Sequence, residues 1–285
     1  MHPRLLAYLR LMRMDRPIGT FLLLWPTLWA LWLAGNGNPD PDIVVIFIVG
    51  TFLMRAAGCV INDYADRGFD ARVERTTNRP LATGELSEQS ALMLFAILLL
   101  ASFLLVLFLN WQTVALSLGG ALVAIAYPFV KRISNLPQLV LGIAFSWGIL
   151  MAYTALTQTL PIEAWIIFVG NFFWIVAYDT QYAMVDREDD LRIGVKSTAI
   201  LFGKFDRLII AMLQFAMLIT MTFLGIRMGL SWHYYLGLCL ATGFAIYQQT
   251  LCFARERERC FSAFLNNNWL GAMIFFGIVL STGDL

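Results

Sequence analysis

The chain has 285 residues, of which 59% are hydrophobic and only 14% are charged, and its net charge is +1. Soluble domains carry about a quarter charged residues, so this composition predicts an integral membrane protein. The near-neutral balance, without a Lys/Arg-rich arm, excludes nucleic acid as the expected partner. The four cysteines lack paired spacing and the two histidines are far apart, so we expect neither a disulfide framework nor a zinc site.

Apolar stretches long enough to cross about 30 Å of hydrocarbon recur along the whole chain. They lie at residues 17–34, 43–61, 90–109, 112–130, 137–156, 162–178, 205–226, 233–253 and 267–282. The first stretch is longer than a typical signal segment, so we interpret it as a retained helix. The sequence therefore predicts an all-α, polytopic membrane protein with nine transmembrane helices, in which residues 1–285 form a single domain.

The basic residues give these helices an orientation. They gather before the first helix and after the second, fourth, sixth and eighth, which all lie on one side of a nine-helix arrangement. Only Arg227 lies on the other side, and Arg55 is inside the second helix. Since basic loops stay in the cytoplasm, we expect a cytoplasmic N-terminus and an outer C-terminus. No Arg/Ser-rich extension of the transit-peptide kind precedes the first helix, so we expect a bacterial cytoplasmic (inner) membrane.

The first of two acidic clusters follows the second apolar stretch. If that helix continues beyond the membrane, Asn62, Asp66 and Asp70 share one face, because four-residue steps drift little around a helix. Carboxylates this close repel one another and are costly to desolvate beside hydrocarbon. We therefore expect a bound cation there, although Asp63 by itself also fits a solvated surface charge.

The second cluster follows the sixth apolar stretch, so we expect it on the same cytoplasmic face. Asp179, Asp186 and Asp190 share a helical face through steps of seven and four residues, with Tyr182 on the same side. Asp189 also fits a solvated charge. A simpler interpretation is that the acidic and basic residues of these loops merely neutralise one another at a solvated surface. This interpretation explains a single cluster well, but it explains less well two clusters on the same side of the membrane, each with its carboxylates on one helical face.

The residue types in these clusters indicate a metal-bound diphosphate. All candidate ligands are oxygen atoms, which favours magnesium, manganese or calcium over zinc. Loops on the same face add basic residues that suit a diphosphate. They are Arg72, Arg75, Arg79, Lys131, Arg132 and Lys196.

Both clusters resemble the paired signatures of the UbiA superfamily of intramembrane prenyltransferases. The signatures here read Asn62-Asp63-x-x-Asp66-x-x-x-Asp70, followed by Arg75-Thr76-Thr77-Asn78-Arg79-Pro80-Leu81, and Asp179-x-x-Tyr182-x-x-x-Asp186-x-x-x-Asp190. Residues 11–19, 54–59, 127–132 and 194–198 are similar to the branch that prenylates 4-hydroxybenzoate. The resemblance covers about residues 4–205.

The resemblance implies a helix bundle around a central cavity with cytosolic helical caps and an active site on the cytoplasmic side. It implies Mg2+ as the cofactor, polyprenyl diphosphate and 4-hydroxybenzoate as substrates in ubiquinone biosynthesis, a membrane-lipid environment and no obligate protein partner. The implied metal ligands are Asn62, Asp66, Asp70, Asp186 and Asp190, and the implied diphosphate ligands are Arg75, Arg79, Lys131 and Lys196. The catalytic set would be Asp66, Asp70, Asp179, Asp186, Asp190 and Lys131, with Tyr182 and Tyr127 in supporting positions.

Two arginines are candidates for binding the carboxylate of an aromatic acid. Arg55 is the only charge well inside an expected span, and such a charge is a functional hypothesis by default. Arg16 opens the first helix on the same face, and a guanidinium matches a carboxylate bidentately. The alternatives are snorkelling or pairing of Arg16 with Asp15. Two rival hypotheses remain. The first is a prenyltransferase for another aromatic acceptor, such as naphthoate or homogentisate, and the second is a membrane transporter for a divalent cation or an anionic solute.

Overall fold

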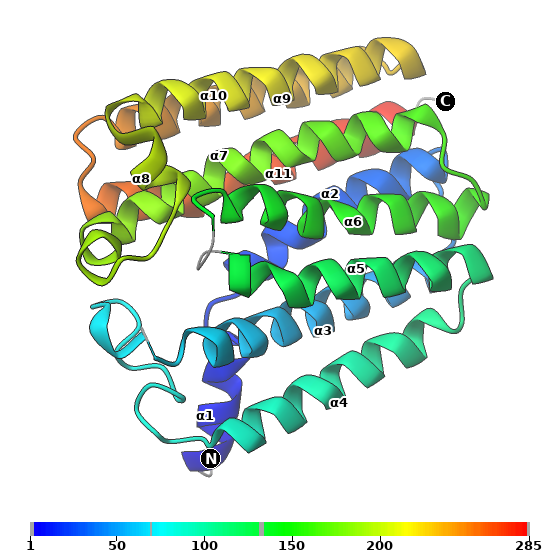
Figure 1. The fold of residues 1–285 in the computed structure, drawn as a ribbon. Helices are drawn as coiled ribbons and strands as arrows, with labels where there is room; N and C mark the ends of the chain where they lie inside the picture. Colours follow the sequence, from blue (N-terminus) through cyan, green and yellow to red (C-terminus); the bar gives the residue numbers. More distant parts are fainter. Residues whose placement is uncertain (1–2, 69, 131–133, 284–285) are drawn as a thin grey trace.

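The computed structural model describes residues 3–68, 70–130 and 134–283, and all regular secondary structure within these ranges is helical. The long helices run side by side as a bundle, with the C-terminus at the end away from α1 (Figure 1). Seven helices among the described residues are long and apolar enough to cross a membrane. The chain is therefore an integral, multi-pass membrane protein, as its composition predicted.

The long helices follow the apolar stretches closely, because each helix satisfies its own backbone hydrogen bonds in lipid. They are α2 (Ile18–Ala34), α3 (Pro41–Asp66), α4 (Glu88–Val106), α5 (Trp111–Val130), α6 (Pro137–Thr157), α7 (Ile162–Ile193), α9 (Asp206–Met228), α10 (Trp232–Leu251) and α11 (Arg257–Thr282). By length and apolarity, α2 is a shorter apolar helix and α10 is not among the seven candidate spans. The count of nine spans therefore stays a prediction.

Four short elements have no counterpart among the apolar stretches. They are α1 (Pro3–Leu11), η1 (Asp70–Arg72), α8 (Thr198–Phe202) and η2 (Gly203–Phe205). Ala7 and Leu11 of α1 are buried against α3. Both α1 and α8 lie at the end of the bundle where α3 and α7 end, on the left in Figure 1.

The two helices that carry the acidic clusters end differently. α7 continues to Ile193 and is closed by Gly194, whose φ of +76° is the left-handed conformation that glycine adopts at helix C-termini. α3 ends at Asp66, shortly before Gly68, and Asp70 lies in the separate turn η1. The expectation that one continuous helix carries Asn62, Asp66 and Asp70 is therefore wrong, because the chain turns after Asp66.

Close approaches of glycines and stacked aromatic rings hold neighbouring helices together. Gly237 of α10 faces α11 so closely that a Cβ there would lie 2.6 Å from the carbonyl oxygen of Met273 and 3.0 Å from the Cα of Gly277. Small residues allow such approaches between membrane helices. Trp29 of α2 stacks on Trp174 of α7 with 5.2 Å between ring centroids. The Trp29–Trp174 contact packs α7, which carries the second acidic cluster, against α2.

Candidate functional site

Both acidic clusters line one polar cavity of about 160 Å3 at the ends of α3 and α7. The two clusters therefore meet, as the sequence predicted. The expected site residues that line this cavity are Asn62, Asp66, Asp70, Arg75, Arg79, Tyr127, Asp179, Tyr182, Asp186, Asp190 and Lys196. Lys131, which was expected to bind diphosphate and take part in catalysis, lies outside the described residues.

A larger cavity of about 580 Å3 adjoins the polar one inside the bundle. Its walls are mostly apolar and reach Leu109, just beyond α4, and Trp147 of α6. Arg16 and Arg55 line this cavity rather than the polar one. Six residues line both cavities: Asn62, Arg75, Arg79, Tyr127, Asp179 and Tyr182. A ligand can therefore have a charged head in one cavity and an apolar body in the other.

Asp63 lies at the centre of an ion-pair network at the boundary of the cavities. Its side chain is 1% exposed, and its oxygens accept from the Nη2 of Arg13 at 2.8 and 2.9 Å. The Nη1 of Arg79 is 2.9 Å from Asp63 and 2.9 Å from Asp70. The interpretation of Asp63 as a solvated charge is wrong, because the fold buries it between two arginines.

The same network sets the ionisation of Asp70, which lies outside the membrane-spanning segments. Burial raises the pKa of Asp70 to about 6; Arg79 opposes that rise, while Asp66 and Asp63 add to it. Burial alone would lower the pKa of Arg79, but Asp63 and Asp70 raise it. Arg79 therefore stays charged, and the raised pKa of Asp70 brings its titration to about pH 6.

Arg75 connects the two clusters. Its Nε donates to both oxygens of Asp186 at 3.0 and 3.1 Å, and its guanidinium carbon lies 4.6 Å from the ring centroid of Tyr182. Asp189, one turn further along α7, is 7% exposed and 3.3 Å from Arg257, which also pairs with Glu74 at 2.7 Å. The interpretation of Asp189 as a solvated charge is therefore wrong as well.

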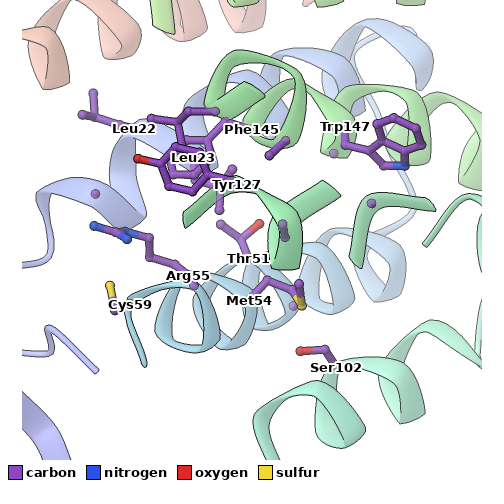
Figure 2. A pocket seen from close by; sticks show the side chains of 18 of the residues that line it. Leu22, Leu23, Thr51, Met54, Arg55, Cys59, Ser102, Tyr127, Phe145 and Trp147 are labelled. Carbon is purple, nitrogen blue, oxygen red and sulfur yellow. The ribbon is translucent and has the colours of Figure 1, made fainter. Parts of the chain in front are cut away.

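The two candidate carboxylate-binding arginines differ in their surroundings. The side chain of Arg16 is 62% exposed, and its Nε is 3.7 Å from Asp15. Arg55 extends from α3 into the larger cavity next to Cys59, and the ring of Tyr127 lies across from it (Figure 2). Within the described residues, no hydrogen bond or ion pair of Arg55 is found. Arg55 is therefore better placed than Arg16 to meet a buried anion.

Arg13 is a site residue that has only a weak signal in the sequence. Its φ of +57° is unusual for a residue other than glycine, and its Nη1 donates to the carbonyl of Arg10 at 2.8 Å while Nη2 binds Asp63. Such strained backbone is typical of functional sites. The only hint is its place within residues 11–19, which contribute to the family resemblance.

Comparison with known proteins agrees with this geometry. A model described as the UbiA prenyltransferase family matches residues 23–276. The chain belongs to this family. It is 59% identical over 280 residues to the 4-hydroxybenzoate octaprenyltransferase of Nitrosococcus oceani, covering 98% of each chain. It is 60% identical over 274 residues to the protein of the same name from Pectobacterium carotovorum, covering 96% of each.

Solved structures of UbiA homologues have the same fold. The apo form from Aeropyrum pernix K1 matches with a TM-score of 0.80 and 23% identity, over 90% of this chain and 97% of that one. A homologue from Archaeoglobus fulgidus bound to GPP and Mg2+ matches with a TM-score of 0.71 and 17% identity, over 96% and 99%. Because the sequence identities are only 23% and 17%, these two structures show that the fold is shared and carry no further argument about function.

The polar cavity of this UbiA family member is lined by carboxylate and amide oxygens, which are the type of ligand that magnesium prefers. Among the described residues, however, no three Asp, Glu, His or Cys side chains are arranged as a metal site. Asp70 and Asp186 face Arg79 and Arg75 instead. These carboxylates would be free to hold a metal only after the two arginines turn away from them.

Proposed function

We propose that this chain transfers a polyprenyl group from polyprenyl diphosphate to the ring carbon ortho to the hydroxyl of 4-hydroxybenzoate, in ubiquinone biosynthesis. The observation that carries the proposal is the shared wall between a carboxylate-lined cavity and a larger apolar one. That arrangement suits an amphipathic substrate with a charged head. The names of the relatives at 59% and 60% identity support the same activity.

The polar cavity binds the diphosphate. Asn62, Asp66, Asp70, Asp186 and Asp190 would hold Mg2+, which neutralises negative charge on the leaving oxygens when it is bound. Arg75 and Arg79 line both cavities and exchange their carboxylate partners for diphosphate oxygens. Lys196, which lines the polar cavity, and Lys131 would bind further diphosphate oxygens. Charge stabilisation of this kind usually contributes most to the rate.

The larger cavity holds the prenyl chain and excludes water from the allylic carbon as its bond to oxygen lengthens. Positive charge develops on that carbon, and water would quench it. Aromatic side chains attract such a charge through their ring faces. The aromatic residues on this wall include Tyr127, Phe145, Trp147, Tyr178 and Tyr182.

Arg55 binds the carboxylate of the acceptor within the larger cavity. Arg55, Cys59, Asn62 and Asp66 follow one another at helical spacing along one face of α3. With a rise of about 1.5 Å per residue, Arg55 lies roughly 10 Å deeper than Asn62. The ring of the acceptor can therefore span from Arg55 toward the diphosphate. We infer that Asp179 takes the ring proton after the new carbon–carbon bond forms; its place on the wall of both cavities supports this role.

The orientation in the membrane follows from the loops at this end of the bundle. We infer nine spans in one domain, with the N-terminus and the active site on the cytoplasmic side of the inner membrane and the C-terminus outside. The connections after α3, α7 and α10, together with the helix ends that flank them, carry 12 of the 20 basic residues and lie at the same end as α1 (Figure 1).

The proposal is tested by a screen of acceptors with the purified protein in detergent, Mg2+ and a long-chain polyprenyl diphosphate. The expected product is the 3-polyprenyl derivative of 4-hydroxybenzoate, identified by mass. Asp66→Ala and Asp186→Ala should each lower kcat at least a hundredfold, whereas Asp42→Ala, an exposed change at the other end of α3, should not. Full activity in Asp66→Ala and Asp186→Ala would exclude the proposed metal site. A preference for naphthoate or homogentisate would exclude 4-hydroxybenzoate as the acceptor.

A further inference from the structure

Arg55 presents its guanidinium to a largely apolar cavity and forms no salt bridge with any described residue, although the carboxylates of Asp63 and Asp179 line the same cavity. Among the described residues, neither a hydrogen bond nor an ion pair to Arg55 is found, although its neighbours across the cavity include Tyr127. A charge inside a membrane-spanning helix is expensive unless a partner compensates it. Its direction into the cavity must therefore be fixed by packing rather than by a salt bridge.

Gly19 of α2 supplies that packing. A Cβ on Gly19 would lie 2.3 Å from both Nε and Nη2 of Arg55 and 2.6 Å from its Cζ, so the guanidinium rests directly on the glycine backbone. Both residues line the larger cavity. The absence of a side chain at position 19 is what allows Arg55 to lie across α2.

No backbone requirement accounts for glycine at this position. Gly19 is not among the glycines with positive φ, and it lies in the first turn of α2. Glycine in a helix costs about 0.5–1 kcal/mol relative to alanine. Glycine at position 19 is therefore explained by the Arg55 guanidinium, which occupies the space that a side chain would need.

We propose that Gly19 is a positioning residue that holds the Arg55 guanidinium in the direction needed to bind a carboxylate, and so selects acidic aromatic acceptors over neutral ones. The inference rests on the proposed function. Gly19 touches no reacting atom; it acts only through Arg55. A Cβ at position 19 displaces the far end of a flexible side chain and leaves the backbone in place, so the fold should tolerate alanine.

The experiment compares 4-hydroxybenzoate with its neutral methyl ester as acceptors. Gly19→Ala should raise KM for the acid about tenfold, because a misdirected guanidinium loses paired, charge-assisted hydrogen bonds. The KM for polyprenyl diphosphate and for the ester should change less than twofold. Gly243→Ala is the matched control, since a Cβ at Gly243 on α10 would meet no atom within 4 Å.

A double-mutant cycle separates positioning from general packing. In the Arg55→Ala background, Gly19→Ala should have no further effect on KM for the acid, because nothing remains to be displaced. An equal loss in both backgrounds, or an unchanged KM in Gly19→Ala alone, overturns the positioning role while the prenyl transfer itself stands. A wild-type protein that prenylates neither acceptor instead overturns the proposed function, and with it this inference.

Discussion

Removal of the negative charge of Asp63 should destabilise the protein far more than removal of a similar charge at its surface. Asp63 is 1% exposed and binds Arg13 at 2.8 and 2.9 Å and Arg79 at 2.9 Å. Breaking a buried ion pair by deleting one partner costs about 3–5 kcal/mol. Arg79 keeps Asp70, and the Arg13 side chain is 20% exposed, so we expect a cost near the lower end, about 3 kcal/mol, for Asp63→Asn.

Glu85 provides the matched control at the same end of the bundle. It pairs with Arg10, but the two side chains are 40% and 41% exposed, and exposed pairs contribute about 0–1 kcal/mol. Glu85→Gln should therefore change the free energy of unfolding, measured by denaturant titration in mixed micelles, by less than about 1 kcal/mol. Equal losses in Asp63→Asn and Glu85→Gln would refute the argument that burial decides the contribution of Asp63.

Three further predictions follow from particular contacts. Because burial raises the pKa of Asp70 from its ordinary value of 3.8 to about 6 in the folded protein, the metal-free wild type should lose stability as the pH rises from about 4 through 6, since burial disfavours the charged form. Asp70→Ala should remove this loss in melting experiments; pH-independent melting of the wild type would contradict the prediction. Gly237→Ala should lower the free energy of unfolding by about 1–3 kcal/mol, because its Cβ would meet the α11 backbone; Gly243→Ala on the same helix is the control, and equal effects would contradict the packing argument. Arg75→Lys should raise KM for the diphosphate about tenfold, because lysine lacks the planar fork that reaches both oxygens of one partner; an unchanged KM in steady-state kinetics would exclude Arg75 as a ligand.

Much of the site was predictable from sequence because the membrane restricts the possible arrangements. Helices that cross it alternate in direction, so acidic stretches after the second and sixth helices emerge at the same end. α7 continues far enough to carry Asp179, Asp186 and Asp190 on one helix, as their spacing predicted. The two clusters meet around one cavity, although α3 stops at Asp66 and Asp70 reaches the cavity from η1.

The sequence by itself determined the membrane class, the positions of the long helices and the end of the bundle at which the charged residues gather. These follow from local hydropathy and helical spacing, which need no knowledge of neighbouring helices. Only the tertiary structure decided that Asp63 is buried between Arg13 and Arg79, and that Gly19 lies beneath Arg55. Such partners are about 16 to 50 residues apart in the chain, and their contacts depend on how helices and loops pack, which no local pattern records.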